Sequence, residues 1–267
     1  MTTADSAPSM AFEPSPGAAP MSRMIAAQAS METRTLLRNG EQLMVTMIIP
    51  LGLLAMLSLE PLVSSGAGSR AGRVDFLAPG IIALAVMSTA FTSQAIATGF
   101  ERRYGVLKRL GTTPLSRGGL IAAKTVTVII VELLQAAVIT AVGVGLGWRP
   151  HATAAAFVTV PLLVLAGTAA FSGLALLMAG TLRAEATLAL ANLVYIVLLG
   201  IGGVVFPLDK FPAAARPFLT LLPTGALATG LRAVLRDAAG VPLRDLAVLA
   251  AWAVVCITLA ARTFRWE

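Results

Sequence analysis

The sequence FERRYGVLKRLGTTPLSRGGLIAAK, residues 100–124, lies between two long apolar segments and is the most basic window of its length in the chain. Lys and Arg are retained on the cytoplasmic side when a membrane protein is inserted. A basic loop between two apolar segments therefore indicates a cytoplasmic connection between two membrane spans. The basic residues of this loop are Arg102, Arg103, Lys108, Arg109, Arg117 and Lys124.

The middle of this stretch predicts a short helix. Val106, Leu107 and Leu110 stand at helical spacing, so one face of the helix is apolar while the other carries basic side chains. Gly111 and Pro114 follow directly, and both are residue types that end helices. The sequence therefore predicts a short cytoplasmic helix whose apolar face contacts a soluble partner.

The composition places the chain among membrane proteins. Hydrophobic residues make up 57% and charged residues 12% of the chain, against about 25% charged residues in an ordinary soluble domain. Apolar segments of about 20 residues recur along the whole length, as bilayer-spanning helices require. The excess of 20 Lys and Arg over 13 Asp and Glu is expected to set topology and to meet anionic lipid headgroups, rather than to bind nucleic acid.

The sequence offers no set of residues suited to catalysis or metal binding. Cys256 is the one cysteine and lies in an apolar segment, and His151 is the one histidine and lies in a short loop. No intrachain disulfide, metal site or Ser-His-Asp triad can be built from them. The Gly-rich residues 200–203 lack the lysine of a phosphate-binding loop and are expected to be packing positions within a span. We therefore expect no bound cofactor and no enzymatic activity in this chain.

An all-α integral membrane fold with six transmembrane helices and both termini in the cytoplasm fits the pattern of apolar segments and basic loops. A flexible external loop is expected at residues 60–75. Residues 207–245 hold too many prolines for a spanning helix and predict two half-buried external helices, near 213–222 and 225–235. The spans are expected at about residues 43–59, 79–99, 120–146, 154–178, 186–206 and 246–261.

The N-terminal residues 1–25 are rich in Ala, Ser, Pro and Met and predict a disordered tail without a signal peptide, ahead of a membrane domain at 26–267. Residues 25–42 then show helical periodicity, although Glu32 interrupts the apolar side. This pattern suits a helix lying in the cytoplasmic interface. An extended linker before the first span is the alternative.

Three polar side chains inside the predicted spans are candidate pathway residues: Glu132, Gln135 and Gln94. A carboxylate within the bilayer is costly unless it is paired or faces water. Glu132 can line a pathway and contact a cationic or hydroxyl-bearing substrate. It can equally lie near the external interface, bond to a neighbouring helix or be protonated. For Gln94, a hydrogen bond between helices is the preferred interpretation.

The basic loop resembles that of ABC-2 type permeases, the membrane subunits of bacterial ABC exporters of the daunorubicin-resistance and nodulation type. The resemblance rests on residues 101–110, 113–116 and Lys124 of the loop, on the proline-containing segment 206–232, and on the terminal residues 264–266. It extends from about residue 24 to the end of the chain. Arg103 departs from the family pattern, which often has an acidic residue at this position.

This resemblance implies a half-transporter in the bacterial inner (plasma) membrane. Two copies, or this chain and a paralogous permease, would form a dimer, and two separate ATP-binding subunits would dock from the cytoplasm with their ATP and Mg²⁺. The cargo would be an amphiphile such as a drug, a lipid or a glycolipid, exported with ATP hydrolysed by the partner. The residues implied in ATPase coupling, within loop 101–117, are Glu101, Arg102, Gly105, Val106, Leu107, Lys108, Leu110 and Pro114.

Two alternative functions belong to other classes. A secondary transporter driven by an ion gradient would show repeated halves and paired charges near the middle of the membrane, and the sequence contains no convincing repeat. A membrane scaffold without transport activity is the second alternative. A membrane enzyme has the least support, because His, Asp and Cys are not clustered.

Overall fold

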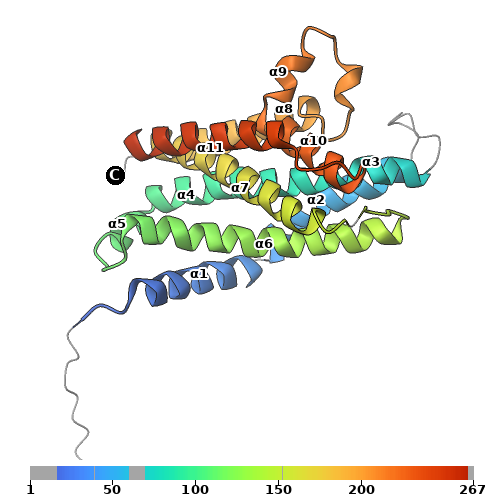
Figure 1. Ribbon diagram of the computed structural model, residues 1–267. Helices are drawn as coiled ribbons and strands as arrows, with labels where there is room; N and C mark the ends of the chain where they lie inside the picture. Colours follow the sequence, from blue (N-terminus) through green and yellow to red (C-terminus); the bar gives the residue numbers. More distant parts are fainter. Residues whose placement is uncertain (1–16, 39, 60–69, 152, 264–267) are drawn as a thin grey trace, which may run out of the picture.

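The computed structural model describes residues 17–38, 40–59, 70–151 and 153–263. Within these ranges the regular elements are helices, and no strand is formed. The chain folds into a bundle of long helices with shorter ones at its two ends (Figure 1). The elements are α1 (Met21–Arg38), α2 (Gly40–Leu59), α3 (Arg70–Val86), the π-helix η1 (Met87–Ser93), α4 (Gln94–Arg103), α5 (Val106–Leu110), α6 (Arg117–Gly145), α7 (Ala156–Thr181), α8 (Ala184–Ile201), the 3₁₀-helix η2 (Leu208–Lys210), α9 (Arg216–Thr220), α10 (Pro223–Leu235) and α11 (Leu243–Thr263).

Five helical segments in the described part of the chain are long and apolar enough to cross a bilayer. They are the continuous run Arg70–Arg103 formed by α3, η1 and α4, followed by α6, α7, α8 and α11. This confirms an all-helical membrane fold. The predicted first span coincides with α2, in which the described apolar segment Thr46–Leu59 is shorter than a spanning helix. The six-span layout therefore remains a prediction.

Two helices have other limits than the spans predicted on them. The helix that contains the predicted second span begins at Arg70, before residue 79, because it tolerates Pro79 and extends through residues assigned to a flexible loop; residues 60–69 of that loop lie outside the described ranges. The helix of the predicted fifth span ends at Ile201, before residue 206. Gly203 has a φ of 70°, and a Cβ at Gly202 would lie 2.3 Å from the Leu198 carbonyl oxygen. Both glycines are thus needed where the helix ends.

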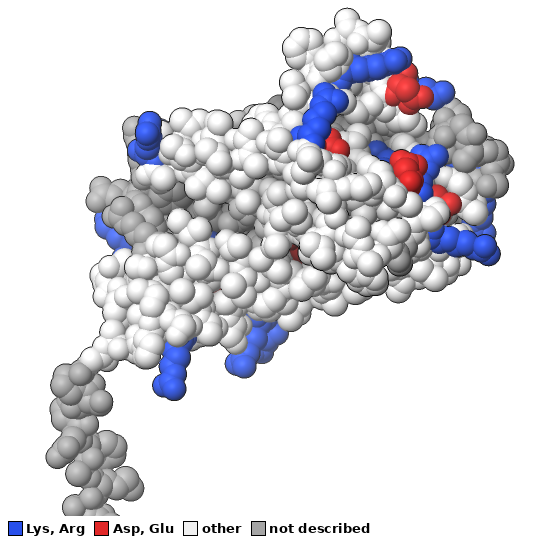
Figure 2. Space-filling model, viewed as in Figure 1, with Lys and Arg blue, Asp and Glu red and all other residues white. Residues whose placement is uncertain are grey.

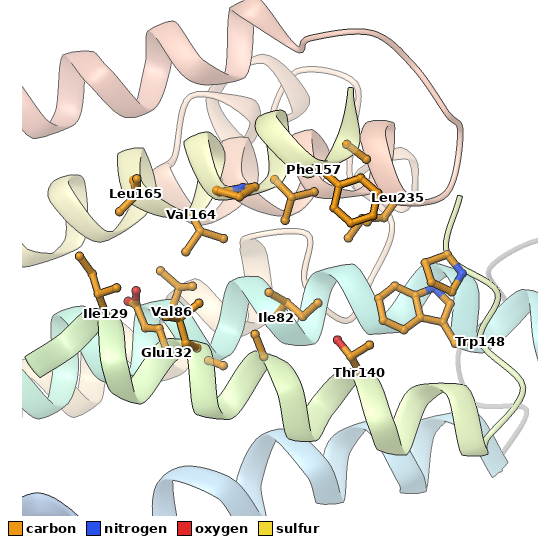
Figure 3. A pocket seen from close by; sticks show the side chains of 17 residues that line it. Ile82, Val86, Ile129, Glu132, Thr140, Trp148, Phe157, Val164, Leu165 and Leu235 are labelled. Atoms are coloured by element: carbon orange, nitrogen blue, oxygen red, sulfur yellow. The ribbon is translucent and has the colours of Figure 1, made fainter. Parts of the chain in front are cut away.

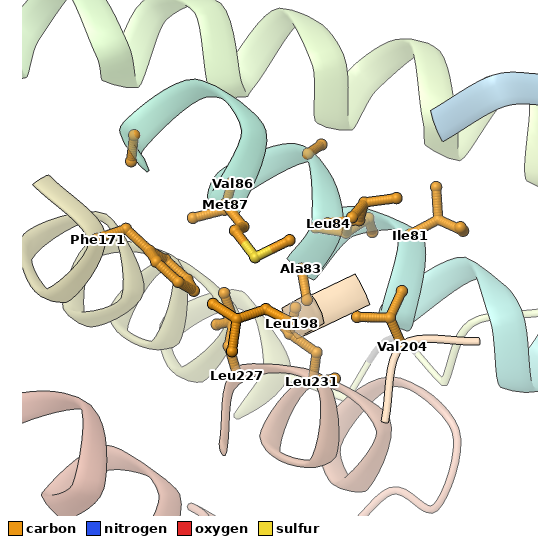
Figure 4. Packing of buried hydrophobic residues seen from close by; sticks show 14 of the residues in the cluster. Ile81, Ala83, Leu84, Val86, Met87, Phe171, Leu198, Val204, Leu227 and Leu231 are labelled. Carbon is orange, nitrogen blue, oxygen red and sulfur yellow. The ribbon is translucent and has the colours of Figure 1, made fainter. Parts of the chain in front are cut away.

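The segment α3–η1 forms the centre of the bundle. Its apolar window is 89% buried, against 33% for α6 and 22% for both α8 and α11. Figure 4 shows Met87 of this segment beside Phe171 of α7 and Leu227 of α10, with Leu84 farther along the segment near Ile81. The other long helices therefore keep large apolar faces on the outside, as lipid contact requires.

The two short helices predicted between the last spans are present as α9 and α10, but they differ in burial. α9 stands away from the bundle (Figure 1) and is mostly exposed, with Leu219 buried, so it is less buried than predicted. α10 is buried along most of its length, which corrects the prediction of a half-buried helix. Its apolar residues pack on α3 and α7, and the guanidinium of Arg232 bonds to backbone carbonyls of the α3 and post-α8 segments.

The N-terminal segment forms α1, so the extended-linker alternative is wrong. α1 begins at Met21, within the residues predicted as a disordered tail; residues 1–16 lie outside the described part. It lies along the Arg117 end of α6 (Figure 1), where Thr127 donates a hydrogen bond to the Ala29 carbonyl at 3.2 Å. A location in the membrane interface remains a prediction.

The ends of the bundle differ in charge. We call the end that carries α5 and the last residues of α11 the α5 end, and the end that carries α9 and the start of α3 the α9 end (Figure 1). On the face shown in Figure 2, acidic side chains gather among basic ones at the α9 end. The charged side chains seen at the α5 end and along α1 are basic.

Candidate functional site

The predicted short helix is present as α5, a single turn at one end of the bundle; its cytoplasmic location stays a prediction. Gly105 precedes it with a φ of 70°, a left-handed conformation that glycine adopts without strain and that turns the chain away from α4. Gly111 follows it and donates its N–H to the Leu107 carbonyl at 2.9 Å. The predicted ending at Gly111 is therefore confirmed, and Pro114 lies beyond it in an exposed turn.

The predicted apolar face of α5 is only partly available to a partner. Leu107 is 2% exposed and lines a cavity of about 340 Å³ with Leu120 of α6 and Ile257 of α11. Val106 is exposed and Leu110 is half-buried. The prediction that Val106, Leu107 and Leu110 all contact a partner is wrong for Leu107, because its side chain faces the bundle. The spacing of apolar residues in a short helix does not show which side of that helix packs against its own protein. The exposed tip of the loop consists of Tyr104, Val106, Lys108 and Arg109.

The base of the loop is held by a buried cluster of one lysine and two carboxylates. Lys124 of α6 is 7% exposed, and its Nζ lies 2.8 Å and 2.7 Å from the two carboxylate oxygens of Glu101 in α4. Glu32 of α1 contributes a third oxygen, 3.5 Å from the same Nζ. Glu101, expected as a coupling residue, is thus an internal anchor. A buried charge that loses its partner is strongly destabilising, so these contacts fix α4, α6 and α1 to one another.

Two arginines tie the loop to the turn between α7 and α8. Arg102 donates a hydrogen bond to the Leu182 carbonyl, and Arg103 forms an ion pair with Glu185. The second pair is more than half exposed and contributes little to stability. The pair joins the end of α4 to the first turn of α8. The loop therefore combines an exposed basic tip with a base attached to three neighbouring segments.

Gln135 and Gln94, two of the predicted pathway residues, are buried between helices. Gln135 accepts a hydrogen bond from Thr89 of η1 at 2.8 Å and donates to the Thr46 carbonyl of α2 at 3.4 Å. These bonds connect α6 to two other helices. Gln94 is 7% exposed, and its Oε1 has no hydrogen-bond partner among the described residues. Neither side chain lines the large cavity beside Glu132.

Glu132 is the predicted pathway residue that does reach a cavity. It lies near the middle of α6 and is 4% exposed. One carboxylate oxygen accepts a hydrogen bond of 2.7 Å from Thr168 of α7, which confirms the expected bond to a neighbouring helix. The other oxygen has no partner in the described part of the chain. Glu132 also lines a cavity of about 500 Å³ between α6 and α7 (Figure 3). Its role in a pathway stays a prediction.

No group of three or more His, Cys, Asp and Glu side chains that could hold a metal ion occurs among the described residues. The candidate site therefore has two parts, a surface loop suited to docking and an intramembrane carboxyl group beside an apolar cavity. The first can transmit motion between a partner and the helices, and the second can bind a ligand through charge or hydrogen bonding.

Comparison with known proteins identifies the family. No curated protein matches the chain with significance. The sequence profile described as the ABC-2 type transporter matches residues 25–235, which is more than half of the chain and includes α1 through α10 except the first residues of α1. Members of this family are the membrane components of ABC transporters and associate with ATP-binding subunits. The chain therefore belongs to the ABC-2 type transporter family, as a multi-pass membrane protein.

Proposed function

We propose that this chain is the permease half of an ATP-driven exporter of amphiphiles. A second copy or a paralogous permease completes the membrane unit, and two ATP-binding subunits dock on the α5 end. The family supports an ABC permease as the general role. Export, the cargo class, the number of subunits and the docking site are our proposal.

The observation that carries the proposal is the contrast between the tip and the base of the α5 loop. Lys108 and Arg109 are exposed at the tip, whereas Glu101 at the base is held by Lys124 within the bundle. Because Lys124 of α6 is bound to Glu101 of α4, a partner bound to the tip would move α4 and α6 together as a rigid body. The exposed basic side chains suit an acidic docking surface on the ATPase.

The orientation of the chain is also part of the proposal. The α5 end faces the cytoplasm of a bacterial cell and the α9 end faces outward across the inner membrane. This orientation is supported by the basic loop and by the acidic residues that accompany the basic ones at the α9 end (Figure 2). Both described terminal segments, α1 and the end of α11, then start or finish on the cytoplasmic side (Figure 1).

A pull-down from native membranes tests the docking site. The tagged chain is purified after mild cross-linking and assayed for co-purifying ATPase activity. The double variant Lys108→Glu/Arg109→Glu reverses two exposed charges at the tip without touching the buried Leu107 or the Lys124 cluster. We expect it to recover about tenfold less ATPase, because each repelled charge pair costs on the order of 0.5–1 kcal/mol at an exposed site.

The matched control is Arg149→Glu/Lys210→Glu, which reverses two exposed charges at the α9 end. It should recover as much ATPase as the unmodified chain. Undiminished recovery of ATPase with Lys108→Glu/Arg109→Glu would contradict docking at the exposed tip. If the unmodified chain recovers no ATPase even after cross-linking, the ATP-driven proposal fails and the gradient-driven carrier becomes the better interpretation.

A further inference from the structure

The seam between α6 and α7 contains two cavities on either side of one hydrogen bond. The cavity toward the α9 end has a volume of about 500 Å³, and the cavity toward the α5 end has a volume of about 340 Å³. Ile129 of α6 and Leu165 of α7 line both. Between them, Thr168 donates its hydroxyl to Glu132 at 2.7 Å. Away from this bond the two helices leave room for a ligand.

The larger cavity, which we call the α6–α7 groove, is open toward the lipid. Three of its lining side chains, Phe157, Leu133 and Leu165, are exposed large hydrophobic residues on the outside of the bundle. Figure 3 shows Glu132 at one end of the groove and Trp148 at the other. Phe157 of α7 lies at the Trp148 end of the groove. An apolar molecule dissolved in the bilayer can therefore enter from the side, without passing through water.

The chemistry of the groove is almost wholly apolar except for one carboxyl group. Among the described residues that line it, Glu132 is the only charged one. The other polar groups are the Thr140 hydroxyl and the indole N–H of Trp148, which has no hydrogen-bond partner among the described residues. The Glu132 Oε1 atom is buried and has no hydrogen-bond partner in the described part of the chain. No Lys or Arg lines the groove, so Glu132 has no counter-ion there.

These features select the charge of the ligand. An ionised carboxylate in an apolar membrane site is costly unless a cation faces it. A ligand with a positive charge supplies that counter-ion, whereas an anion would be repelled by Glu132 and would find no basic side chain in the groove. The rings of Trp148 and Phe157 offer aromatic surface to the apolar body of such a ligand, away from its charge. The groove is therefore complementary to an apolar body that carries one positive charge.

We propose that the α6–α7 groove is a binding site for lipophilic cations, with Glu132 as the counter-ion. Such a ligand enters from the bilayer, places its charge at the unpartnered oxygen of Glu132 and lays its apolar body along the groove toward Trp148. The inference rests on the proposed function only in treating the ligand as cargo of the exporter. Binding itself takes place within one chain and requires no ATPase.

The test uses the purified full-length chain, without any ATPase, in phosphatidylcholine nanodiscs. The probes are tetraphenylphosphonium and tetraphenylborate, which have nearly the same size and shape and opposite charge. Binding is measured at equilibrium after subtraction of the uptake by empty nanodiscs. We expect saturable binding of the cation and none of the anion above the empty-disc level. Equal binding of both probes, or of neither, overturns the proposal and leaves a groove that holds only lipid chains.

Glu132→Gln keeps the shape of the side chain and removes its charge. We expect it to weaken binding of the cation by about tenfold or more, because a unit charge pair in a site of low polarity is lost. Glu132→Asp should restore much of the affinity. The matched control is Asp209→Asn, which removes an exposed carboxylate at the α9 end and should leave binding unchanged. Unchanged affinity in Glu132→Gln overturns the role of Glu132.

A labelling experiment locates the ligand even if Glu132→Gln fails to fold. Thr140→Cys is introduced into a Cys256→Ser background and treated with a membrane-soluble maleimide. Tetraphenylphosphonium should slow this labelling several-fold. It should leave the labelling of Val144→Cys unchanged, because Val144 is exposed on α6 outside the groove. Equal protection of both positions would overturn the site. Failure of these experiments leaves the ATPase pull-down unaffected, so the two proposals fail separately.

Discussion

Arg232 shows how a single side chain holds together segments that are far apart in the sequence. Its guanidinium donates to the carbonyls of Phe76 at 2.9 Å, Gly203 at 2.6 Å and Val204 at 2.7 Å. Its Cζ also lies 3.9 Å from the centre of the Phe76 ring, a cation–π geometry. Burial, and to a smaller extent the nearby charge of Arg236, lower the pKa of Arg232 to about 9, while the charge of Asp237 opposes this shift. The side chain is therefore charged at neutral pH.

We predict that Arg232→Met destabilises the fold by about 3 kcal/mol or more. Three buried carbonyls would lose their donor, and each unsatisfied group costs about 1–3 kcal/mol. Unfolding by dodecyl sulfate in mixed micelles, followed through the reactivity of the buried Cys256, measures the change. Arg236→Met removes a neighbouring arginine that is only half-buried and should change stability by less than about 1 kcal/mol. Similar losses in both variants would refute the special role of Arg232.

The π-helix η1 distinguishes the second span from a regular α-helix. It places Thr89 against Gln135 of α6, where the hydroxyl donates to the amide oxygen at 2.8 Å. π-helical turns inside long α-helices occur frequently at functional sites. Here the turn lies between the buried α3 and the α4 segment that leads into the α5 loop. The bond between η1 and α6 thus lies on the structural connection from the loop to the centre of the bundle.

A double-mutant cycle with Thr89→Val and Gln135→Leu tests this connection. Interhelical hydrogen bonds in membranes contribute about 0.6 kcal/mol on average, so we expect a coupling free energy of about that size or somewhat more. The two variants and their combination are compared by unfolding in mixed micelles. Thr229→Val paired with Gln135→Leu serves as the control, because Thr229 bonds within its own helix and to Asp245. Zero coupling for the first pair would contradict the assigned bond.

The elements were largely predictable because bilayer helices leave a strong apolar signal. All five candidate spans in the described part of the chain overlap predicted ones, and α5 was predicted from the spacing of three apolar side chains. The sequence could not indicate that Leu107 turns inward, because the burial of a short helix depends on helices distant in the sequence. The same reason explains why α10 is more buried than predicted. π-Helical geometry has no pattern of its own in the sequence, so η1 was missed.

The contact partners of the site were not predictable, although one signal existed for each charged residue. Glu32 interrupts the apolar side of α1, and the structure explains this by its contact with Lys124. Glu185 lies in the first turn of α8 and forms an ion pair with Arg103. A charged residue that breaks an apolar pattern indicates that a partner exists. It does not identify that partner, because Glu32 and Lys124 are brought together only by the packing of α1 on α6.

The bundle as a whole has two ends that must lie on opposite sides of the membrane if α6 spans it. α6 runs from the α5 loop to Trp148, and its 28-residue apolar segment is long enough to cross about 30 Å of hydrocarbon at about 1.5 Å per residue. Lys108 at the α5 end and Lys210 at the α9 end therefore lie on opposite sides. Their accessibility in intact cells reports the orientation of the entire molecule.

We predict that a membrane-impermeant maleimide labels Lys210→Cys in intact cells and labels Lys108→Cys only after the cells are permeabilised. Each substitution is made in a Cys256→Ser background, since Cys256 is the one cysteine of the chain. Retention of basic loops in the cytoplasm is the physical reason for this pattern. Labelling of Lys108→Cys alone in intact cells would indicate the opposite orientation, with the α5 loop outside the cell. ATP-binding subunits in the cytoplasm could not reach the loop in that orientation. Labelling of both positions would require that α6 does not span the bilayer, because its two ends would then lie on one side.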